Sequence, residues 1–569
     1  MGTVAKSSAA DGLPFATLAR MRSLLAIIAI CVGCSDGGDG ASPQPDAGSP
    51  LEPDLTGPLY DRQRVIDVAI ELPAADWDAL RMQTRPAGDI FGTCTTGPRP
   101  SPFTWFRATK VTVDGVTIAG AGVRKKGFYG SLDEERPSFK IKTDEYVKDQ
   151  QLFGIKSLTL NNAKQDPALV RQCLAFDVFA RAGVPAPRCN FARVRVNGTS
   201  LGAYVNVESV GKPFLRRHFA NDERNLYEGS ISDFRPLWTE TFDKKTNESD
   251  PSRADLDAIA AALAKPDAEL LAALEPLVDI EQFLDYWAAE ILIDHSDSYS
   301  GLANNFFVYD DPTSDKMVFM PWGVDQTFND PGAPAIVANG LLARRLYLLP
   351  QTRDRYIARL RQQLDTVWKE TELLAEVDRM AALIAAPAAE VDGVRNFIRT
   401  RRAELVAALA SGPPPWTAPF KPNAKPCFEQ NGDVAVTFDT RWGTLGAPDA
   451  FATGTGTMTG TIEGTTIATQ RVGSMAGYGE QGEAIVQLIG EHANGTYTIV
   501  YAALPPTSFV APADVAVQSA AVFRYTAATD TFEAIGFVFG GTIHFDAAST
   551  TDGQPVRGRM NVQTIGLPF

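Results

Sequence analysis

The hydrophobic pattern of this chain changes twice, and these changes limit its possible folds more than any single motif does. Between Val65 and Glu208, short runs alternate between apolar and polar residues, as strands do, around a short helical stretch at Ala75–Met82 and a main one at Pro167–Arg181. From Asp255 to Ala410, Ala and Leu recur with the 3.6-residue period of helices. From Cys427 onward, short alternating runs rich in Thr, Val and Gly return. We therefore expect an α+β chain with β-rich, helical and all-β parts in succession.

A Pro-rich segment separates the helical part from the last part. Residues 412–426 contain three consecutive prolines and end on another, which predicts a stiff linker. We predict one bilobal domain over 58–411, with a β-rich amino-terminal lobe and a helical carboxy-terminal lobe. Residues 427–569 are predicted to form a separate β-sandwich-like domain.

The amino terminus has the pattern of a secretory signal. Basic residues precede the apolar run 24–30, which is too short to span a bilayer. A small residue before Cys34 resembles a bacterial lipoprotein cleavage site, so Cys34 would carry the lipid; a plain secretory signal is the alternative. We predict a signal over 1–34, with Met21 as an alternative start, and a disordered tether over 35–57. The protein is then expected outside the cytoplasm, held to the membrane only by lipid.

Charge and cysteine content narrow the possible partners. The formal net charge of −15 argues against nucleic-acid binding, because phosphate backbones attract basic proteins. Cys94, Cys173, Cys189 and Cys427 remain after the signal, which allows two disulfides in any of three pairings, or free thiols. The few His residues are scattered and predict no zinc site. The sequence gives no indication of an oligomeric state.

Two acids and an Asn pair surround a predicted β-hairpin between residues 294 and 328. Phosphoryl transfer needs one carboxylate that orients the nucleophile, and a second carboxylate with an amide oxygen that holds Mg²⁺. Asp297 is the candidate catalytic base, although a helix-end or turn role is the alternative on the residues alone. Asp325 is the candidate metal ligand, with Asn304 or Asn305 as the second ligand. Only one of two neighbouring residues in a strand can face the site.

Basic side chains that could contact phosphates lie on two predicted strands. Lys140 and Lys142 alternate with apolar residues, so both should lie on one face, and Arg124 and Lys126 share a face by the same reasoning. Lys140 is the favoured phosphate ligand, and Arg124 and Lys126 would add charge. A solvated sheet edge is the alternative for all of them.

Three further residues complete the expected site and its surroundings. Glu208 is a candidate carboxylate partner of Lys140, and Trp322 is a candidate wall of the nucleotide site or simply a core residue. Asp166, followed by Pro167, is expected to cap the helix that ends at Arg181.

These motifs together resemble the CotH (spore coat protein H) kinase family, over roughly Leu59 to Leu409. The resemblance implies a protein-kinase-like two-lobed fold that phosphorylates Ser on protein substrates with ATP and a divalent metal, Mg²⁺ or Mn²⁺. The segments that carry it are Arg124–Gly127, Arg136–Lys142, Leu160–Asn162, Asp166, Arg171, Gly183–Pro185, Asn197–Tyr204, Glu208, Asp297–Tyr309, Met320–Trp322 and Asp325.

One position departs from the family pattern. The family usually has Pro-Trp-Asp-x-Asp, and Gly323 replaces the first of these acids, whereas Asp325 is kept. If the second acid binds the metal, the site is complete and the chain is a CotH-type protein kinase. The alternative is a catalytically inactive surface lipoprotein that acts in adhesion or ligand binding.

Overall fold

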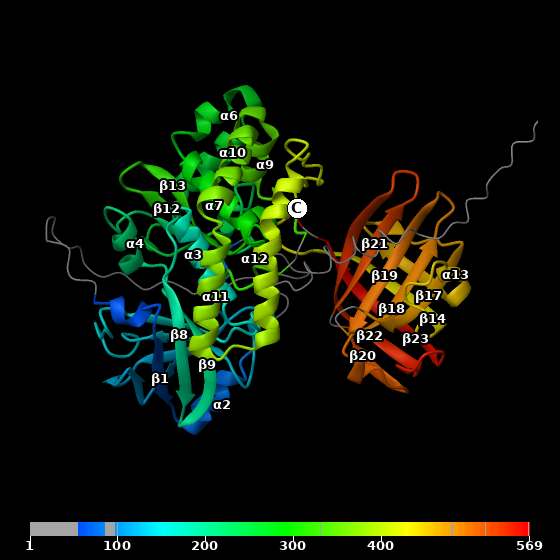
Figure 1. Ribbon diagram of the computed structural model, residues 1–569, viewed down its shortest axis with the longest axis horizontal. Helices are drawn as coiled ribbons and strands as arrows, with labels where there is room; N and C mark the ends of the chain where they lie inside the picture. The colour runs from blue at the N-terminus through cyan, green and yellow to red at the C-terminus, as the bar shows by residue number, and fades with distance from the viewer. Residues whose placement is uncertain are drawn as a thin grey trace, which may run out of the picture. The chain divides into compact units, whose positions relative to one another are not determined.

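The computed structural model describes residues 55–85, 97–99, 101–329, 332–479, 482–517, 519–566 and 568. The predicted signal, the lipidation site Cys34, the tether up to residue 54 and Cys94 lie outside the described residues. The described chain divides into two compact units at residues 426 and 427. We call them the first unit and the β unit, and Figure 1 shows the elements of each.

A nine-stranded sheet forms the β-rich part of the first unit. Its neighbouring strands are antiparallel except for β1 and β8, which run parallel. Two hairpins of this sheet turn at Asp114–Gly115 and Asn197–Gly198, which are residue pairs that favour tight hairpin turns. The strands in sheet order are β2 (Phe106–Arg107), β5 (Gly122–Lys126), β6 (Ser138–Lys142), β7 (Ser157–Asn161), β9 (Thr199–Val207), β8 (Cys189–Val196), β1 (Val65–Glu71), β3 (Lys110–Val113) and β4 (Val116–Ile118).

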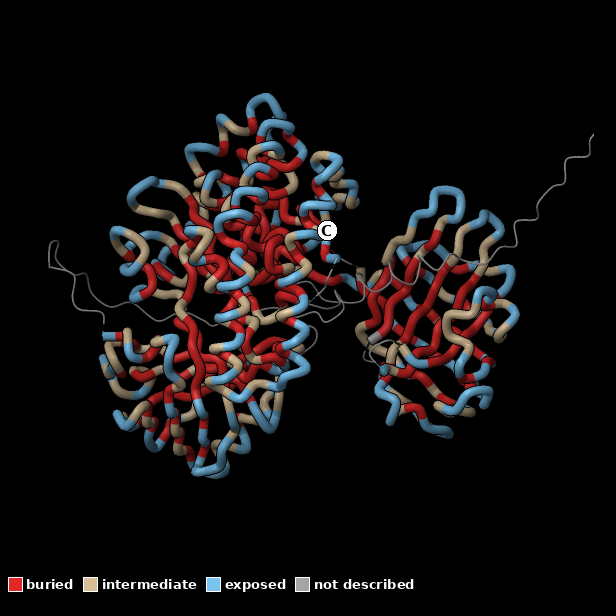
Figure 2. The backbone as a smooth tube through the Cα atoms, viewed as in Figure 1, coloured by how far each residue is buried: buried red, intermediate tan, exposed pale blue. Residues whose placement is uncertain are grey.

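Two hydrophobic cores lie against this sheet. One contains Ile66, Phe139 and other inward-facing strand residues together with α2 (Ala74–Arg81). The other joins α3 (Arg171–Arg181) to strands β8 and β9 and to the helical part. Figure 2 shows the buried stretches of these strands in red. The sheet is therefore covered on both faces and forms a rigid base for the side chains that leave its edges.

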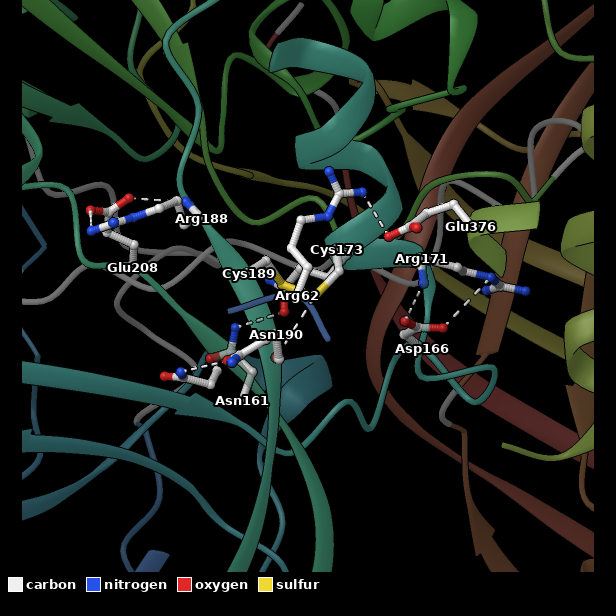
Figure 3. Close-up of a disulfide and its surroundings, with 12 residues drawn as sticks. Arg62, Asn161, Asp166, Arg171, Cys173, Arg188, Cys189, Asn190, Glu208 and Glu376 are labelled. Carbon is white, nitrogen blue, oxygen red and sulfur yellow. Dashed lines mark hydrogen bonds and ion pairs between the residues drawn. A yellow bond between two sulfur atoms is a disulfide. The ribbon is translucent and has the colours of Figure 1, made fainter. Parts of the chain in front are cut away.

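The start of α3 differs from the prediction. The helix was expected from Pro167, but it begins at Arg171, because Leu169 adopts a left-handed conformation with φ +63°. Asp166 still accepts the backbone N–H of Arg171 at 2.8 Å, so it satisfies a helix donor from outside the helix. A disulfide joins Cys173 in α3 to Cys189 at the start of β8 (Figure 3).

The helical part contains a second, four-stranded sheet. Only the hairpin of β12 (Phe306–Asp311) and β13 (Lys316–Pro321) was predicted; β10 (Leu226–Gly229) and β11 (Asp243–Lys244) extend it. The helical pattern of residues 341–369 corresponds to two helices, because Pro350 begins the second. The helices are α4 (Lys212–His218), α5 (Ala254–Leu263), α6 (Asp267–Leu274), α7 (Ile280–Leu292), α8 (Tyr299–Leu302), α9 (Leu341–Leu348), α10 (Pro350–Thr366), α11 (Glu370–Ile384) and α12 (Ala388–Ala408).

The β unit is one continuous ten-stranded sheet rather than the two separate sheets of a sandwich. Strand β17 packs against β14 and β15, and a bridge joins Trp442 to Ala476, so the sheet rolls around its own core. The strand order is β16 (Thr465–Thr466), β15 (Thr455–Ile462), β14 (Gln430–Arg441), β23 (Pro555–Ile565), β22 (Thr531–Ala547), β21 (Ser519–Thr526), β19 (Thr496–Leu504), β18 (Ala484–Glu491) and β17 (Arg471–Tyr478), with β20 (Ala513–Ala516) paired to β22 and a short α13 (Ala450–Thr453).

None of the helices in the described part of the chain is both long enough and apolar enough to cross a bilayer.

Candidate active site

The loop that follows α7 brings Asp297 together with the Asn pair. The side-chain amide nitrogen of Asn304 donates to one Asp297 carboxylate oxygen at 2.9 Å, and that of Asn305 donates to the other at 2.7 Å. The expectation that only one Asn faces the site is wrong. Both residues precede β12, and Asn305 adopts a left-handed conformation with φ +53°, so the alternation of a strand does not apply.

The carboxyl group of Asp297 is almost completely buried, with 3% of the residue exposed. Burial raises the pKa of Asp297 well above its usual range, and the nearby charge of Asp325 raises it further. The two amide donors oppose this rise because they stabilise the charged form. Asp297 is thus a fixed carboxyl group with an unusually high proton affinity.

Buried charges fix the loop that carries Asp297. Glu290 of α7 accepts the backbone N–H groups of Tyr299 and Ser300 at 3.2 and 3.3 Å. The Tyr299 hydroxyl donates to Asp233 at 3.0 Å, and Asp233 pairs with the buried Arg235 at 2.8 Å. Burial raises the pKa of Glu290 to about 7. None of these supporting residues was predicted, because each looks like an ordinary helix or loop residue in the sequence.

Asp325 lies in the turn after β13, partly exposed and close enough to Asp297 for their charges to interact. Burial of its carboxyl group raises the pKa of Asp325 to about 6, and the positive charges of Lys126 and Arg171 oppose this rise. A third acid, Asp166, also interacts with Asp325; burial raises the pKa of Asp166 to about 7. Sequence reasoning assigned Asp166 only a capping role, so this third acid is an addition to the site.

A pocket of about 980 Å³ is lined by Phe307 and Trp322, which lie two residues after Asn305 and three residues before Asp325 in the sequence. Four of the five residues predicted to bind the cofactor line it: Arg124, Lys140, Glu208 and Trp322. The nine-stranded sheet supplies the first two, and the neighbouring residue Phe307 comes from β12 of the four-stranded sheet. Trp322 is both wall and core residue, since it is 6% exposed and packs edge-to-face on Phe307 with ring centroids 5.5 Å apart.

Arginine residues hold Glu208 in place. Its carboxylate accepts a 2.8 Å bond from the side chain of Arg188 and a second bond from Arg217. The Lys140 ammonium group lies 3.3 Å from the hydroxyl of Ser209, the residue next to Glu208. Lys140 and Glu208 thus line the same pocket, and the observed partners of Glu208 are two arginines that the sequence did not suggest.

Comparison with known proteins agrees with the motifs. A sequence model of the family described as "CotH kinase protein" matches residues 123–405. By this match, residues 123–405 belong to the CotH kinase family. The matched segment includes the Asp297 loop, Asp325 and every predicted cofactor-binding residue.

Two curated relatives support the CotH assignment over part of their length. The inner spore coat protein H of Bacillus subtilis is 27% identical over 207 residues, which are 34% of this chain and 56% of that protein. The inner spore coat protein H-like protein of the same organism is 33% identical over 93 residues, 16% of this chain and 30% of that protein. The first match thus spans about half the length of its relative, and the second spans about a third.

Solved structures resemble the chain only distantly. The proinflammatory kinase CtkA of Helicobacter pylori matches with 10% identity and a TM-score of 0.26, over 51% of this chain and 90% of that one. The toxin–antitoxin HipA–HipB–DNA complex of Shewanella oneidensis matches with 11% identity and a TM-score of 0.25, over 60% and 72%.

Lys126, the fifth predicted cofactor-binding residue, lies on the acidic side of the CotH domain site. It is 1% exposed and does not line the pocket, although its strand neighbour Arg124 does. Its ammonium group donates to the side-chain oxygen of Asn161 at 2.6 Å, and its charge acts on Asp325. Strand β5 therefore carries one positive charge to the pocket and another to the acids.

The donor set of the CotH domain fits a hard divalent cation. The side-chain oxygen of Asn305 is buried and has no hydrogen-bond partner among the described residues, which is unusual for a buried amide. Carboxylate and amide oxygens are the ligands that Mg²⁺ accepts, and it needs few from the protein. The described residues contain no group of three or more His, Cys, Asp or Glu residues able to hold a metal. A cation site here would combine Asp325 with the amides.

The departure at Gly323 has a steric explanation. Gly323 has φ +51°, and a Cβ atom added there would lie 2.3 Å from the side-chain oxygen of Asn305. The Asn305 amide is held by its bonds to Asp297 and cannot move away freely. Position 323 therefore accommodates no side chain in this conformation, and the acid that the family usually has there is absent from the site.

Proposed function

We propose that the CotH domain is an ATP- and divalent-metal-dependent protein kinase that phosphorylates Ser on protein substrates. One observation carries this proposal. The Asn pair bonded to Asp297, and the partly exposed Asp325, lie within a few residues of Phe307 and Trp322, which line a pocket large enough for a nucleotide together with Arg124 and Lys140. Family membership supports the same class of reaction.

Within this proposal, Asp297 orients the Ser hydroxyl and accepts its proton. A general base acts best when its pKa lies near the working pH, and the raised pKa of Asp297 moves it in that direction. The Asn304 and Asn305 amides fix the carboxylate, so the base does not have to be ordered when the substrate arrives.

The remaining residues divide between the nucleotide and the cation. ATP would supply the transferred phosphoryl group, and Mg²⁺ or Mn²⁺ would neutralise phosphate charge. Arg124 and Lys140 in the pocket would contact phosphates, and Trp322 would form a wall. Asp325 and the Asn305 side-chain oxygen would hold the cation, with Asn304 mainly orienting Asp297.

The location remains part of the proposal. The signal pattern and Cys34 favour an enzyme anchored by lipid outside the cytoplasm, with a protein substrate as its partner.

Transfer of labelled phosphate from ATP tests the function. The full chain without its signal is incubated with Mg²⁺ or Mn²⁺ and a Ser-rich protein, and Asp297→Ala and Asp325→Ala are compared with wild type. Loss of either acid is expected to reduce transfer by about 10²–10⁴-fold. Asp315→Ala is the matched control, because this acid lies in the β12–β13 hairpin but its side chain is 75% exposed. Absence of transfer by wild type, or retention by both variants, contradicts the proposal.

A further inference from the structure

Three consecutive residues in the first turn of α3 each link the helix to another part of the first unit. Arg171 contacts Asp166 twice. Its backbone N–H donates to one carboxylate oxygen of Asp166 at 2.8 Å, and its Nε lies 3.8 Å from the other oxygen. Gln172 accepts a 3.0 Å hydrogen bond from the side chain of Asn161. Cys173 forms the disulfide with Cys189. Figure 3 shows the disulfide between the Asp166–Arg171 pair and the Arg188–Glu208 pair.

The middle link continues to a lysine. Asn161, at the end of β7, accepts the 2.6 Å hydrogen bond of Lys126 with its side-chain oxygen while its amide nitrogen donates to Gln172. Gln172 is 3% exposed and Lys126 is 1% exposed, so both ends of this hydrogen-bond series are shielded from water, whereas Asn161 between them is partly exposed. Hydrogen bonds in such surroundings are stronger than in water and hold their partners in one geometry.

The chain of amides has a direction. Lys126 can only donate, so Asn161 must present its oxygen to Lys126 and its nitrogen to Gln172, which presents its own oxygen. Each group therefore specifies the orientation of the next, from the helix to the ammonium group. An ion pair between a strand lysine and a helix glutamate serves this purpose in protein kinases generally. Here two neutral amides connect the helix and the lysine.

The disulfide fixes the helical end of this series of hydrogen bonds. Cys173 follows Gln172 directly, and its Cα lies 5.2 Å from that of Cys189 in the nine-stranded sheet. A covalent bond at this place limits movement of the helix turn relative to the sheet that carries Asn161 and Lys126. The turn is held from two sides, by the disulfide and by the Arg171–Asp166 contact.

We propose that Gln172 and Asn161 are positioning residues that aim Lys126 at the phosphate–cation region beside Asp325, with the first turn of α3 as their fixed support. This inference rests on the proposed kinase function. It assigns the essential phosphate-side lysine to Lys126, and Lys140 then contacts the nucleotide from the pocket wall.

Enzyme kinetics on matched variants of the full protein test whether these hydrogen bonds position Lys126. Asn161→Ala and Gln172→Ala are expected to lower kcat/KM for ATP by about 10- to 100-fold, because a small displacement of a positioned group has a large effect on transfer. Gln172→Glu should retain most activity, since its carboxylate still accepts from Asn161. Asn206→Ala is the control: this fully buried amide of the same sheet bonds to Asn190 and Leu59 rather than to Lys126.

A second readout reports the position of Lys126 without nucleotide. Trace acetylation with acetic anhydride, quantified by mass spectrometry, measures the reactivity of each lysine. Lys126 should react faster in Asn161→Ala and Gln172→Ala than in wild type and in Gln172→Glu. Lys125 is the internal reference, because it is equally buried but bonds to the Arg81 carbonyl.

The outcomes separate this inference from the proposed function. If wild type transfers phosphate and the two Ala variants match Asn206→Ala in kinetics and in Lys126 acetylation, the positioning role is wrong and the kinase remains. If wild type transfers no phosphate, the kinase proposal fails, and unchanged Lys126 acetylation in both variants would then overturn the positioning role independently. Restored kinetics in Gln172→Glu, together with faster acetylation in the Ala variants, supports it.

Discussion

The first unit and the β unit differ in what they bury. The described part of the first unit buries ionisable side chains, among them Asp166, Glu290 and Asp297. The buried polar residues described in the β unit are all neutral: Thr440, Ser474, Gln487, Thr498 and Thr564. Burial of an ionisable group costs free energy unless partners compensate for it. The first unit thus buries costly charged groups, among them those of the candidate site, whereas the buried polar groups described in the β unit carry no charge.

The raised pKa values sharpen this difference. Burial raises the pKa of Asp166, Asp297 and Asp325 together, within one small region of the CotH domain. Such clusters are characteristic of functional sites, where the fold tolerates a local loss of stability. The comparison therefore predicts that charge removal stabilises the first unit and that equivalent changes elsewhere do not.

The largest expected effect on stability is that of Asp166→Asn. Because the folded-state pKa of Asp166 is raised to about 7, the folded protein binds a proton that the unfolded chain releases between about pH 4 and pH 7. The free energy of unfolding thus falls as pH rises through this window. A rise of about three pKa units corresponds to roughly 4 kcal/mol, so the variant should gain up to that amount at pH 8 and nothing near pH 4.

Urea unfolding at pH 4, 6 and 8 measures this gain. Asp315→Asn is the control, because its side chain is 75% exposed. A gain for Asp166→Asn that is equal at pH 4 and pH 8 would show that its charge is not the cause.

Removal of the Cys173–Cys189 disulfide should have the next largest effect. The bond closes a loop with a sequence separation of 16, so replacement of both residues by Ala should destabilise the first unit by about 3 kcal/mol. Chemical unfolding followed by hydrogen exchange with mass spectrometry resolves the two units. The β unit should keep its protection, and an equal loss in both units would contradict the separation of their cores.

Gly323→Ala should lower the free energy of unfolding by about 2 kcal/mol more than replacement by Ala of a glycine that has a positive φ but no close neighbour. The matched control is Gly198→Ala, because Gly198 also has a positive φ of +84° but open space around its Cβ position. Calorimetric unfolding gives both values. The excess should vanish in an Asn305→Gly background, which removes the colliding amide; an excess that persists there would place the strain elsewhere.

Ser474→Ala in the β unit should have the smallest effect. Its buried hydroxyl bonds to the carbonyl oxygens of Thr455 and Asp439 at 2.9 and 3.2 Å, so the β unit should lose about 1 kcal/mol. Phosphate transfer should stay at the wild-type rate. A clear drop in transfer in a folded variant would mean that the β unit contributes to the reaction.

Local sequence patterns predicted much of the sheet and of the helices. The Asp114–Gly115 and Asn197–Gly198 turns form hairpins because all four residues tolerate positive φ, and Phe139 and Ile141 alternate into the core as expected. Strand β10 was missed because its four residues are all buried and show no alternation. A short, fully buried strand has no periodic signal of its own.

The site was predictable only in part, because several of its features depend on distant segments. Asp297 and the Asn pair could be named from the motif, but the left-handed Asn305 that lets both amides reach Asp297 could not. The sequence also could not pair Cys173 with Cys189, which requires the packing of α3 on β8. Asp166 and Glu290 look like surface residues until tertiary contacts bury them.

The most direct test of the contrast between the two units is calorimetric titration of the full chain with ATP, with and without Mg²⁺. If the buried charges of the first unit form a nucleotide site, ATP binds to wild type with a 1:1 stoichiometry, Mg²⁺ strengthens binding, and Asp325→Ala removes the Mg²⁺ effect but leaves the β unit folded. If wild type binds no ATP with or without Mg²⁺, the charged centre is not a kinase site, and a binding protein without catalytic activity becomes the better description.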